Sequence, residues 1–177
     1  MSTFIKEIND ETLRQLPKVA GAYVLVIELS ADLTLQNKRF AGASLAKGTY
    51  LYCGSANGPG GIAARVKRHC KQDKKPHWHV DELTSNGAGR VVSVLVVPGG
   101  NECDLRAALQ EPDTQVPILG FGSSDCSLCQ THLLKATMKR PQQGNRIAGF
   151  PMVGAAVRLE TLQRYISDHI HWGSKPD

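Results

Sequence analysis

The sequence lacks long hydrophobic runs, internal repeats and low-complexity segments. No apolar segment of the 177-residue chain approaches the roughly 20 residues of a membrane-spanning helix. The first residues, MSTFIKEINDE, are acidic and contain no apolar core of the kind that a signal peptide needs. We therefore expect a protein that makes no contact with a membrane and resides in the cytoplasm.

A disulfide framework is a second feature that the sequence does not favour. Five cysteines are an odd number, and a reducing compartment keeps cysteines as thiols. Cys103 and the segment Cys126-x-x-Cys129-x-x-His132 nevertheless combine ligand types that zinc prefers. Because the spacing is short and no second CxxC pair exists, we favour buried structural thiols beside a helical histidine. Zinc binding by these four residues is the alternative.

The positive charge of the chain is concentrated in one segment. The formal net charge is +5, and residues 60–79 hold six lysines and arginines against one acidic residue, Asp73, which accounts for the whole excess. A local basic cluster is typical of proteins that bind a phosphate backbone, and a solvated helix face is the other interpretation. The candidate nucleic-acid contacts are Lys67, Arg68, Lys71, Lys74 and Lys75.

A strand, a glycine-rich turn and a helix are expected in succession between residues 49 and 70. Residues 49–53 are rich in β-branched and aromatic types, and on a strand Tyr52 lies on the opposite face from Cys53. Several glycines then allow close backbone approach. Beyond them, apolar residues recur at helical spacing, and Arg65 and His69 lie one turn apart on the polar side. We expect Cys53 to point into the core, where a thiol is inert.

The whole pattern predicts an α+β domain with a small, mostly antiparallel, three-stranded central sheet flanked by helices. Residues 21–29 and 91–97 are apolar runs that fit buried strands, and Asn101 fits the N-cap of a helix. Residues 1–140 are expected to form the domain, and 141–177 a strand-helix extension packed on it. Further helices are expected over 10–16, 77–83 and 132–138.

Several motifs, in this order, resemble the GIY-YIG nuclease superfamily. GAY, ending at Tyr23, and YCG, beginning at Tyr52, stand for its two tripeptides. Arg65 and His69 match its Arg-x-x-x-His helix, and Glu102 matches its downstream glutamate. The segments GSA, WHVDEL and FGSSDC are similar to one largely uncharacterised branch, which is sometimes fused to DNA-repair glycosylases. The resemblance covers most of the chain.

The resemblance implies an endonuclease that hydrolyses phosphodiester bonds of DNA, in DNA repair or on structured DNA. Tyr52 is expected to take the proton of water, with Tyr23 beside it orienting water or phosphate. Arg65 and His69 are expected to bind the phosphate. Glu102 is expected to be the single carboxylate ligand of Mg²⁺ or Mn²⁺. A phenol titrates near pH 10, so it acts as a base only where neighbouring cations or the metal lower its pKa.

One departure from the superfamily pattern leaves alternative functions open. The superfamily often carries an asparagine after its glutamate, and the corresponding position here is Thr114. This leaves open whether catalysis is kept or is supplied by another polar group, such as Ser123 or Asp125. A nucleic-acid-binding module that keeps the fold without turnover is therefore one alternative. A zinc-stabilised interaction protein is the other. The chain has no obvious second DNA-binding domain, so sequence specificity is expected to be low or to come from a protein partner.

The segment around Trp78 also has two interpretations. His77, His79 and Asp81 are ligand types for a metal, and Trp78 could stack on a base. In the other interpretation Trp78 belongs to the core, and Asp81 caps a turn or pairs with a basic residue.

Overall fold

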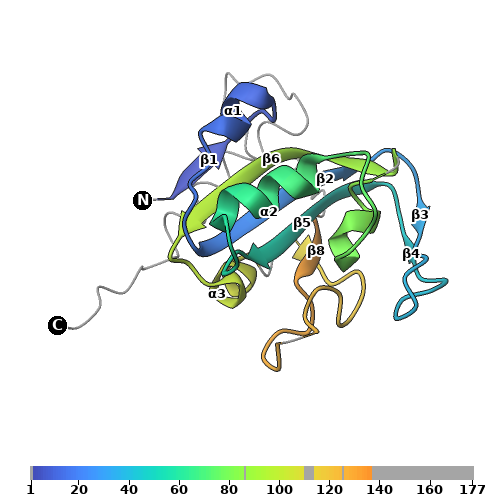
Figure 1. Cartoon of the computed structure of the whole chain (residues 1–177). Coiled ribbons are helices and arrows are strands. Elements are labelled where there is room, and N and C mark those ends of the chain that lie inside the picture. The colour runs from blue at the N-terminus through green and yellow to red at the C-terminus, as the bar shows by residue number, and fades with distance from the viewer. Residues whose placement is uncertain (1, 86, 110–113, 125, 137–177) are drawn as a thin grey trace, which may run out of the picture.

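One antiparallel sheet of six strands organises the described part of the chain (Figure 1). The computed structural model describes residues 2–85, 87–109, 114–124 and 126–136. The strand order is β1-β6-β2-β5-β8-β7, and every neighbouring pair is antiparallel. The strands are β1 (Thr3–Ile5), β2 (Gly21–Leu29), β5 (Gly48–Ser55), β6 (Gly89–Pro98), β7 (Thr114–Gln115) and β8 (Leu133–Ala136). A separate small sheet pairs β3 (Leu33–Thr34) with β4 (Ser44–Leu45).

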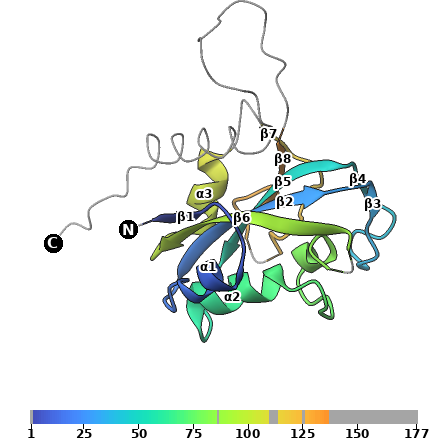
Figure 2. The same ribbon diagram turned by 90° about the horizontal axis from the view of Figure 1, so that it is seen from above.

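Helices cover both faces of the large sheet (Figure 2). Helix α2 (Gly61–Cys70) and the 3-10 helix η1 (His79–Glu82) pack on one face. Helix α3 (Glu102–Ala108) packs on the other face, and its N-cap is Asn101, as predicted. The short helix α1 (Asp10–Arg14) contacts α2. Residues of α2 and the first residue of α3 come close to each other at one end of the sheet, although the two helices lie on opposite faces.

Alternating side chains along the central strands build two apolar cores. On β5, Tyr50 and Tyr52 face the α2 side, and Leu51 and Cys53 face the α3 side, as predicted. β2 supplies side chains to both cores, which explains its continuous apolar sequence. Cys53 is fully buried, and burial raises the pKa of its thiol, so Cys53 is a core residue and no nucleophile.

The predicted α+β class with a mostly antiparallel sheet is confirmed, but the predicted limit of three strands is wrong. Strands β2, β5 and β6 form the centre as expected, and β1, β8 and β7 extend the sheet at its two edges. The added strands have 3, 4 and 2 residues, which is too short for an alternating pattern to be recognised.

The chain forms strand β8 where the sequence predicts a helix over 132–138. Residues 133–135 pair with Tyr50–Tyr52 of β5. A short apolar run fits a strand and a helix equally well by periodicity, so the open edge of β5 decides the outcome. The strand and helix expected within 141–177 lie outside the described residues. Within the described ranges, no helix is long and apolar enough to cross a membrane.

Candidate active site

A cavity of about 240 Å³ lies at the end of the sheet where β2 begins and β5 and β6 end. The register pairs Gly21 with Pro98 and Ala22 with Ser55, so residues that are distant in sequence meet there. All five residues that the resemblance assigns to catalysis or metal binding line the cavity: Tyr23, Tyr52, Arg65, His69 and Glu102. The other lining residues are Gly54, Ser55, Trp78, Gly122, Cys126 and His132.

A chain of buried hydrogen bonds runs from the cavity into the protein. The hydroxyl of Tyr23 lies 2.9 Å from Nε2 of His69, and Nδ1 of His69 lies 3.0 Å from Oδ1 of Asp81. A carboxylate only accepts, so Nδ1 of His69 carries the proton that is shared with Asp81. Nε2 is then the acceptor for the Tyr23 hydroxyl. Burial lowers the pKa of His69, so its imidazole is neutral near pH 7 and available as a proton acceptor.

Asp81 is the last residue in this series of hydrogen bonds. Burial alone would raise its pKa, but hydrogen bonds from His69 and from the backbone N–H groups of His77 and Trp78 lower the pKa well below its ordinary value. Arg68 adds an ion pair, with Nη2 3.2 Å from Oδ2 of Asp81. The interpretation in which Asp81 caps a turn and pairs with a basic residue is therefore confirmed.

The two phenols of the cavity have different surroundings. Burial is the main cause that raises the pKa of both Tyr23 and Tyr52, the carboxylates of Asp81 and Glu102 raise it further, and Arg65 lowers it without reversing the shift. Both phenols are therefore protonated near neutral pH. The Tyr23 hydroxyl has His69 as an acceptor, whereas the Tyr52 hydroxyl has no hydrogen-bond partner among the described residues. The condition for Tyr52 to act as a base, a lowered pKa, is not met by the side chains around it.

Two glycines leave the space that the phenols occupy. A Cβ atom on Gly54 would lie 2.5 Å from the hydroxyl of Tyr23, which faces Gly54 in the β2–β5 register. A Cβ atom on Gly122 would lie 2.7 Å from the ring of Tyr52. Gly122 also has a φ of +74°, which side-chain-bearing residues rarely adopt. The positions of both rings therefore depend on residues without side chains.

Arg65 and Glu102 present unpaired charges to the same cavity. The guanidinium of Arg65 lies over the ring of Trp78, 4.3 Å from its centroid, and forms no hydrogen bond or ion pair within the described part of the chain. The carboxylate of Glu102, the first residue of α3, likewise has no hydrogen-bond or ion-pair partner among the described residues. An arginine and a glutamate that share a cavity without pairing leave both charges free for a ligand.

The basic residues after Gly60 separate into surface and internal groups. Lys71 and Lys75 are exposed, and Lys67 is half-buried. Lys74 is buried, and its ammonium donates to the carbonyl oxygens of His69 at 3.1 Å, of Thr84 at 2.5 Å, and of Lys71. Lys74 is therefore unavailable to a phosphate backbone, which corrects its predicted role. The contacts to residue 84 come from tertiary packing that composition does not reveal.

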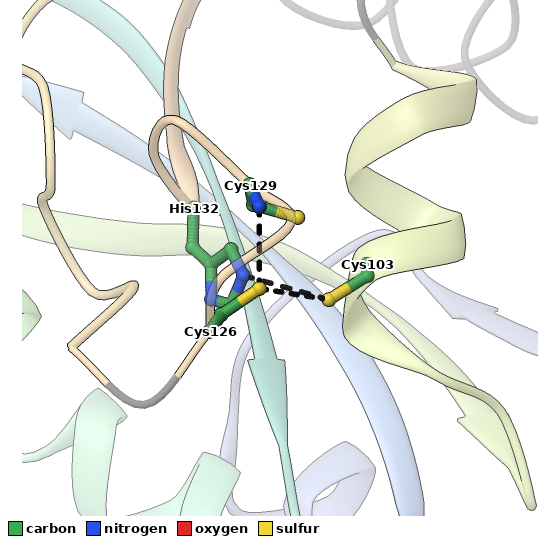
Figure 3. A group of neighbouring side chains, drawn as sticks. All are labelled: Cys103, Cys126, Cys129 and His132. Carbon is green, nitrogen blue, oxygen red and sulfur yellow. Dashed lines mark hydrogen bonds between the residues drawn. The ribbon is translucent and has the colours of Figure 1, made fainter.

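A second group of side chains, made of possible metal ligands, borders the cavity. The donor atoms of Cys103, Cys126, Cys129 and His132 all lie within 4.8 Å of one another, so this group could hold a metal ion (Figure 3). The favoured sequence interpretation, buried thiols beside a helical histidine, is wrong here. The three cysteines are half-buried and converge, and His132 directly precedes strand β8. His77, His79 and Asp81 form no comparable group in the residues that the structure covers.

Some residues of this site have no counterpart in the sequence reasoning. No spacing rule connects Asp81 with His69, and nothing in the sequence around Gly122 indicates that its missing side chain makes room for Tyr52. Thr114, the position that corresponds to the family asparagine, lies in β7 and does not line the cavity. Ser123 is buried but does not line it either, and Asp125 lies outside the described residues.

Comparison with known proteins gives one family. A family model described as a domain of unknown function, DUF123, matches residues 22–151. No curated protein and no solved structure matches the chain. The matched stretch includes every residue that lines the cavity.

Proposed function

The chain belongs to the DUF123 family of domains of unknown function, and from this premise we propose that it is a divalent-metal-dependent endonuclease that hydrolyses phosphodiester bonds of DNA. One observation supports this proposal most strongly: Arg65 and Glu102 line one cavity and both lack a partner among the described residues. A phosphate bound through a cation is a ligand that uses both charges at once. The resemblance of the motifs to the GIY-YIG superfamily supports the same reaction.

The hydrogen-bond chain suggests how the attacking water loses its proton. The water oxygen bonds to phosphorus while its proton moves to the oxygen of Tyr23, and the Tyr23 proton moves to Nε2 of His69. The ester P–O bond breaks, and the leaving oxygen takes a proton from solvent. Asp81 stabilises the imidazolium that forms on His69. In this proposal Tyr23, and not Tyr52, is the phenol that passes the proton, because only Tyr23 has an acceptor.

The remaining residues have complementary roles. Arg65 offers two N–H groups in a planar fork to the phosphate oxygens. Tyr52, whose raised pKa keeps it protonated, donates a hydrogen bond to the phosphate. Glu102 offers one carboxylate without a competing partner, which suits Mg²⁺ or Mn²⁺, because such ions keep several water ligands. When bound, the cation stabilises the negative charge that develops on the phosphate.

The DNA on either side of the scissile bond is expected to follow α2. Lys67 lies on this helix, and Lys71 and Lys75 follow it in the chain. Such contacts go to the phosphate backbone and carry no sequence information. We therefore expect preference for a DNA structure rather than a sequence, as in DNA repair, or specificity supplied by a protein partner.

The test is cleavage of nicked, branched and single-stranded DNA in the presence of Mg²⁺ or Mn²⁺. Loss of the cation ligand in Glu102→Gln should slow cleavage at least about 10³-fold, because metal stabilisation of the transition state is worth several kcal/mol. Asp104→Asn, an exposed residue in the same turn of α3, is the matched control and should cleave at the wild-type rate. Binding of DNA by the wild type without cleavage of any substrate would favour the non-catalytic binding module, which the threonine at position 114 also favours.

A further inference from the structure

Two segments bring three cysteine sulfurs and one histidine nitrogen to one point beside the cavity (Figure 3). Cys103 lies in the first turn of α3, and the other three ligands come from the segment 126–132 that leads into β8. Sγ of Cys103 lies 3.4 Å from Sγ of Cys126 and 3.9 Å from Nε2 of His132. Around a tetrahedral ion with bonds near 2.3 Å, neighbouring ligand atoms are about 3.8 Å apart. The side chains are therefore already near the spacing that a single ion requires.

The donor chemistry selects the kind of metal. Three thiol sulfurs and one imidazole nitrogen form a set that Zn²⁺ binds in closed tetrahedral sites. Mg²⁺ and Ca²⁺ prefer oxygen ligands, so these ions are not expected to bind here. Four protein ligands complete the tetrahedron and leave no position for substrate. The composition of the group thus indicates a structural ion, distinct from the catalytic cation expected at Glu102.

Backbone contacts hold the ligand-bearing segments in place. The N–H of Cys129 lies 3.3 Å from Sγ of Cys126, a backbone-to-sulfur bond of the kind that supports a coordinating thiolate. The buried Arg106, one turn after Cys103, donates from Nε to the carbonyl of Thr131 at 3.0 Å. The backbone N–H of His132 donates a hydrogen bond to the carbonyl of Phe121, and the carbonyl of His132 accepts one from the N–H of Cys53 in β5. The ligands are thus positioned by bonds that do not require the ion.

We propose that Cys103, Cys126, Cys129 and His132 bind one zinc ion, and that this ion fixes the Glu102 side of the cavity. Glu102 directly precedes Cys103, and Cys126 and His132 themselves line the cavity. An ion on these ligands ties the start of α3 to the loop that carries Gly122, whose lack of a side chain leaves room for the ring of Tyr52. The proposed zinc site does not depend on the proposed nuclease activity. Only the expected effect of zinc on cleavage rests on that activity.

The first experiment measures metal in the purified full-length chain by elemental analysis and native mass spectrometry. We expect about one zinc ion per chain in the wild type, and loss of zinc in Cys126→Ser and Cys103→Ser. Cys70→Ser is the matched control, because Cys70 is a half-buried cysteine of α2 outside the group, and it should retain the zinc. A folded wild type with no more zinc than Cys126→Ser, or with iron in its place, would overturn the proposal.

A spectrum keeps the test decisive where a variant fails to fold. Co²⁺ added to metal-depleted wild type should give thiolate-to-metal charge-transfer bands and the strong visible bands of a tetrahedral site, and Zn²⁺ should displace them. Weak octahedral bands without charge transfer would exclude coordination by the cysteines and contradict the proposal.

The positioning role has its own readout. Zinc removal should speed backbone hydrogen exchange in residues 101–106 and 120–124, and leave the exchange of α2 unchanged. If the wild type cleaves DNA, zinc removal should also raise the Mg²⁺ concentration needed for half-maximal cleavage, and added zinc should restore it. Unchanged exchange in both segments would refute the positioning role. Zinc binding in a protein that cleaves no DNA would leave this site standing and refute only the proposed nuclease.

Discussion

The two walls of the cavity are built in different ways. On the α2 side, Tyr23, His69 and Asp81 are buried and joined by hydrogen bonds of 2.9 and 3.0 Å. On the α3 side, Glu102 is half-buried and has no partner in the described residues, and the cysteines beside it are half-buried. One wall is organised by hydrogen bonds between its own side chains, and the other gathers metal-ligand types that have few such bonds. The comparison suggests that proton transfer is preorganised and that the second wall is completed by metals.

The largest expected effect separates the two phenols within the organised wall. Tyr23→Phe removes the hydroxyl that bonds His69, and we expect cleavage to slow about 10²- to 10⁴-fold, the range for loss of a general base. Tyr52→Phe should have a smaller effect, because Tyr52 only binds the phosphate in this account. Tyr50→Phe, a buried tyrosine on the same face of β5, is the control. Single-turnover rates measure the difference, and equal losses for Tyr23 and Tyr52 would contradict the assignment.

The next effect concerns the residue that holds His69. Asp81→Asn keeps the size of the side chain but removes its charge, and an amide can favour the wrong imidazole tautomer. We expect cleavage to slow about 10²-fold. We also expect the acid limb of the pH–rate profile to move to lower pH, because Asp81 raises the pKa of His69. Glu82→Gln, the neighbouring residue of η1, should change neither. A slower variant with an unchanged pH profile would indicate a merely structural role.

A smaller effect distinguishes surface lysines from the buried one. The double variant Lys71→Gln, Lys75→Gln should weaken DNA binding and reduce the slope of log affinity against log salt by up to about 1.8, about 0.9 for each lost contact. Lys74→Gln should leave this slope unchanged and lower the stability, because Lys74 bonds internal carbonyl groups. Fluorescence anisotropy over a salt series measures the slopes. A reduced slope for Lys74→Gln would contradict the internal position.

The smallest effect is the dependence of stability on pH. The pKa of His69 is lowered in the folded state, so below about pH 6.5 the unfolded chain binds more protons and stability falls as the pH falls. The pKa of His79 is also lowered by burial, so His79 acts in the same direction. The pKa of Asp81 is also lowered in the folded state, so Asp81 adds a further loss of stability as the pH falls below the ordinary carboxyl pKa of 3.8. Urea unfolding between pH 8 and 5 should show a shallower decline for His69→Gln than for the wild type; identical slopes would contradict the buried neutral imidazole.

Sequence reasoning predicts the α2 wall better than the α3 wall, and the reason is physical. Tyr52, Arg65 and His69 lie on elements with clear periodicity, which predicts their faces. Tyr23 lies in a continuous apolar strand, and only the resemblance of its motif singles it out. Asp81 joins them only through a tertiary contact across a short 3-10 helix, which has no periodic signature. The short edge strands and the convergence of the cysteines depend likewise on chain pairing that local pattern does not encode.

The most direct measurement of the central claim is a crystal structure with Mn²⁺ and a DNA strand whose phosphodiester resists hydrolysis. The account predicts anomalous Mn²⁺ scattering at the Glu102 carboxylate, with the phosphate between that ion and the guanidinium of Arg65. Mn²⁺ absent from Glu102, with DNA bound only to the exposed lysines, would contradict a catalytic cavity and leave a nucleic-acid-binding surface.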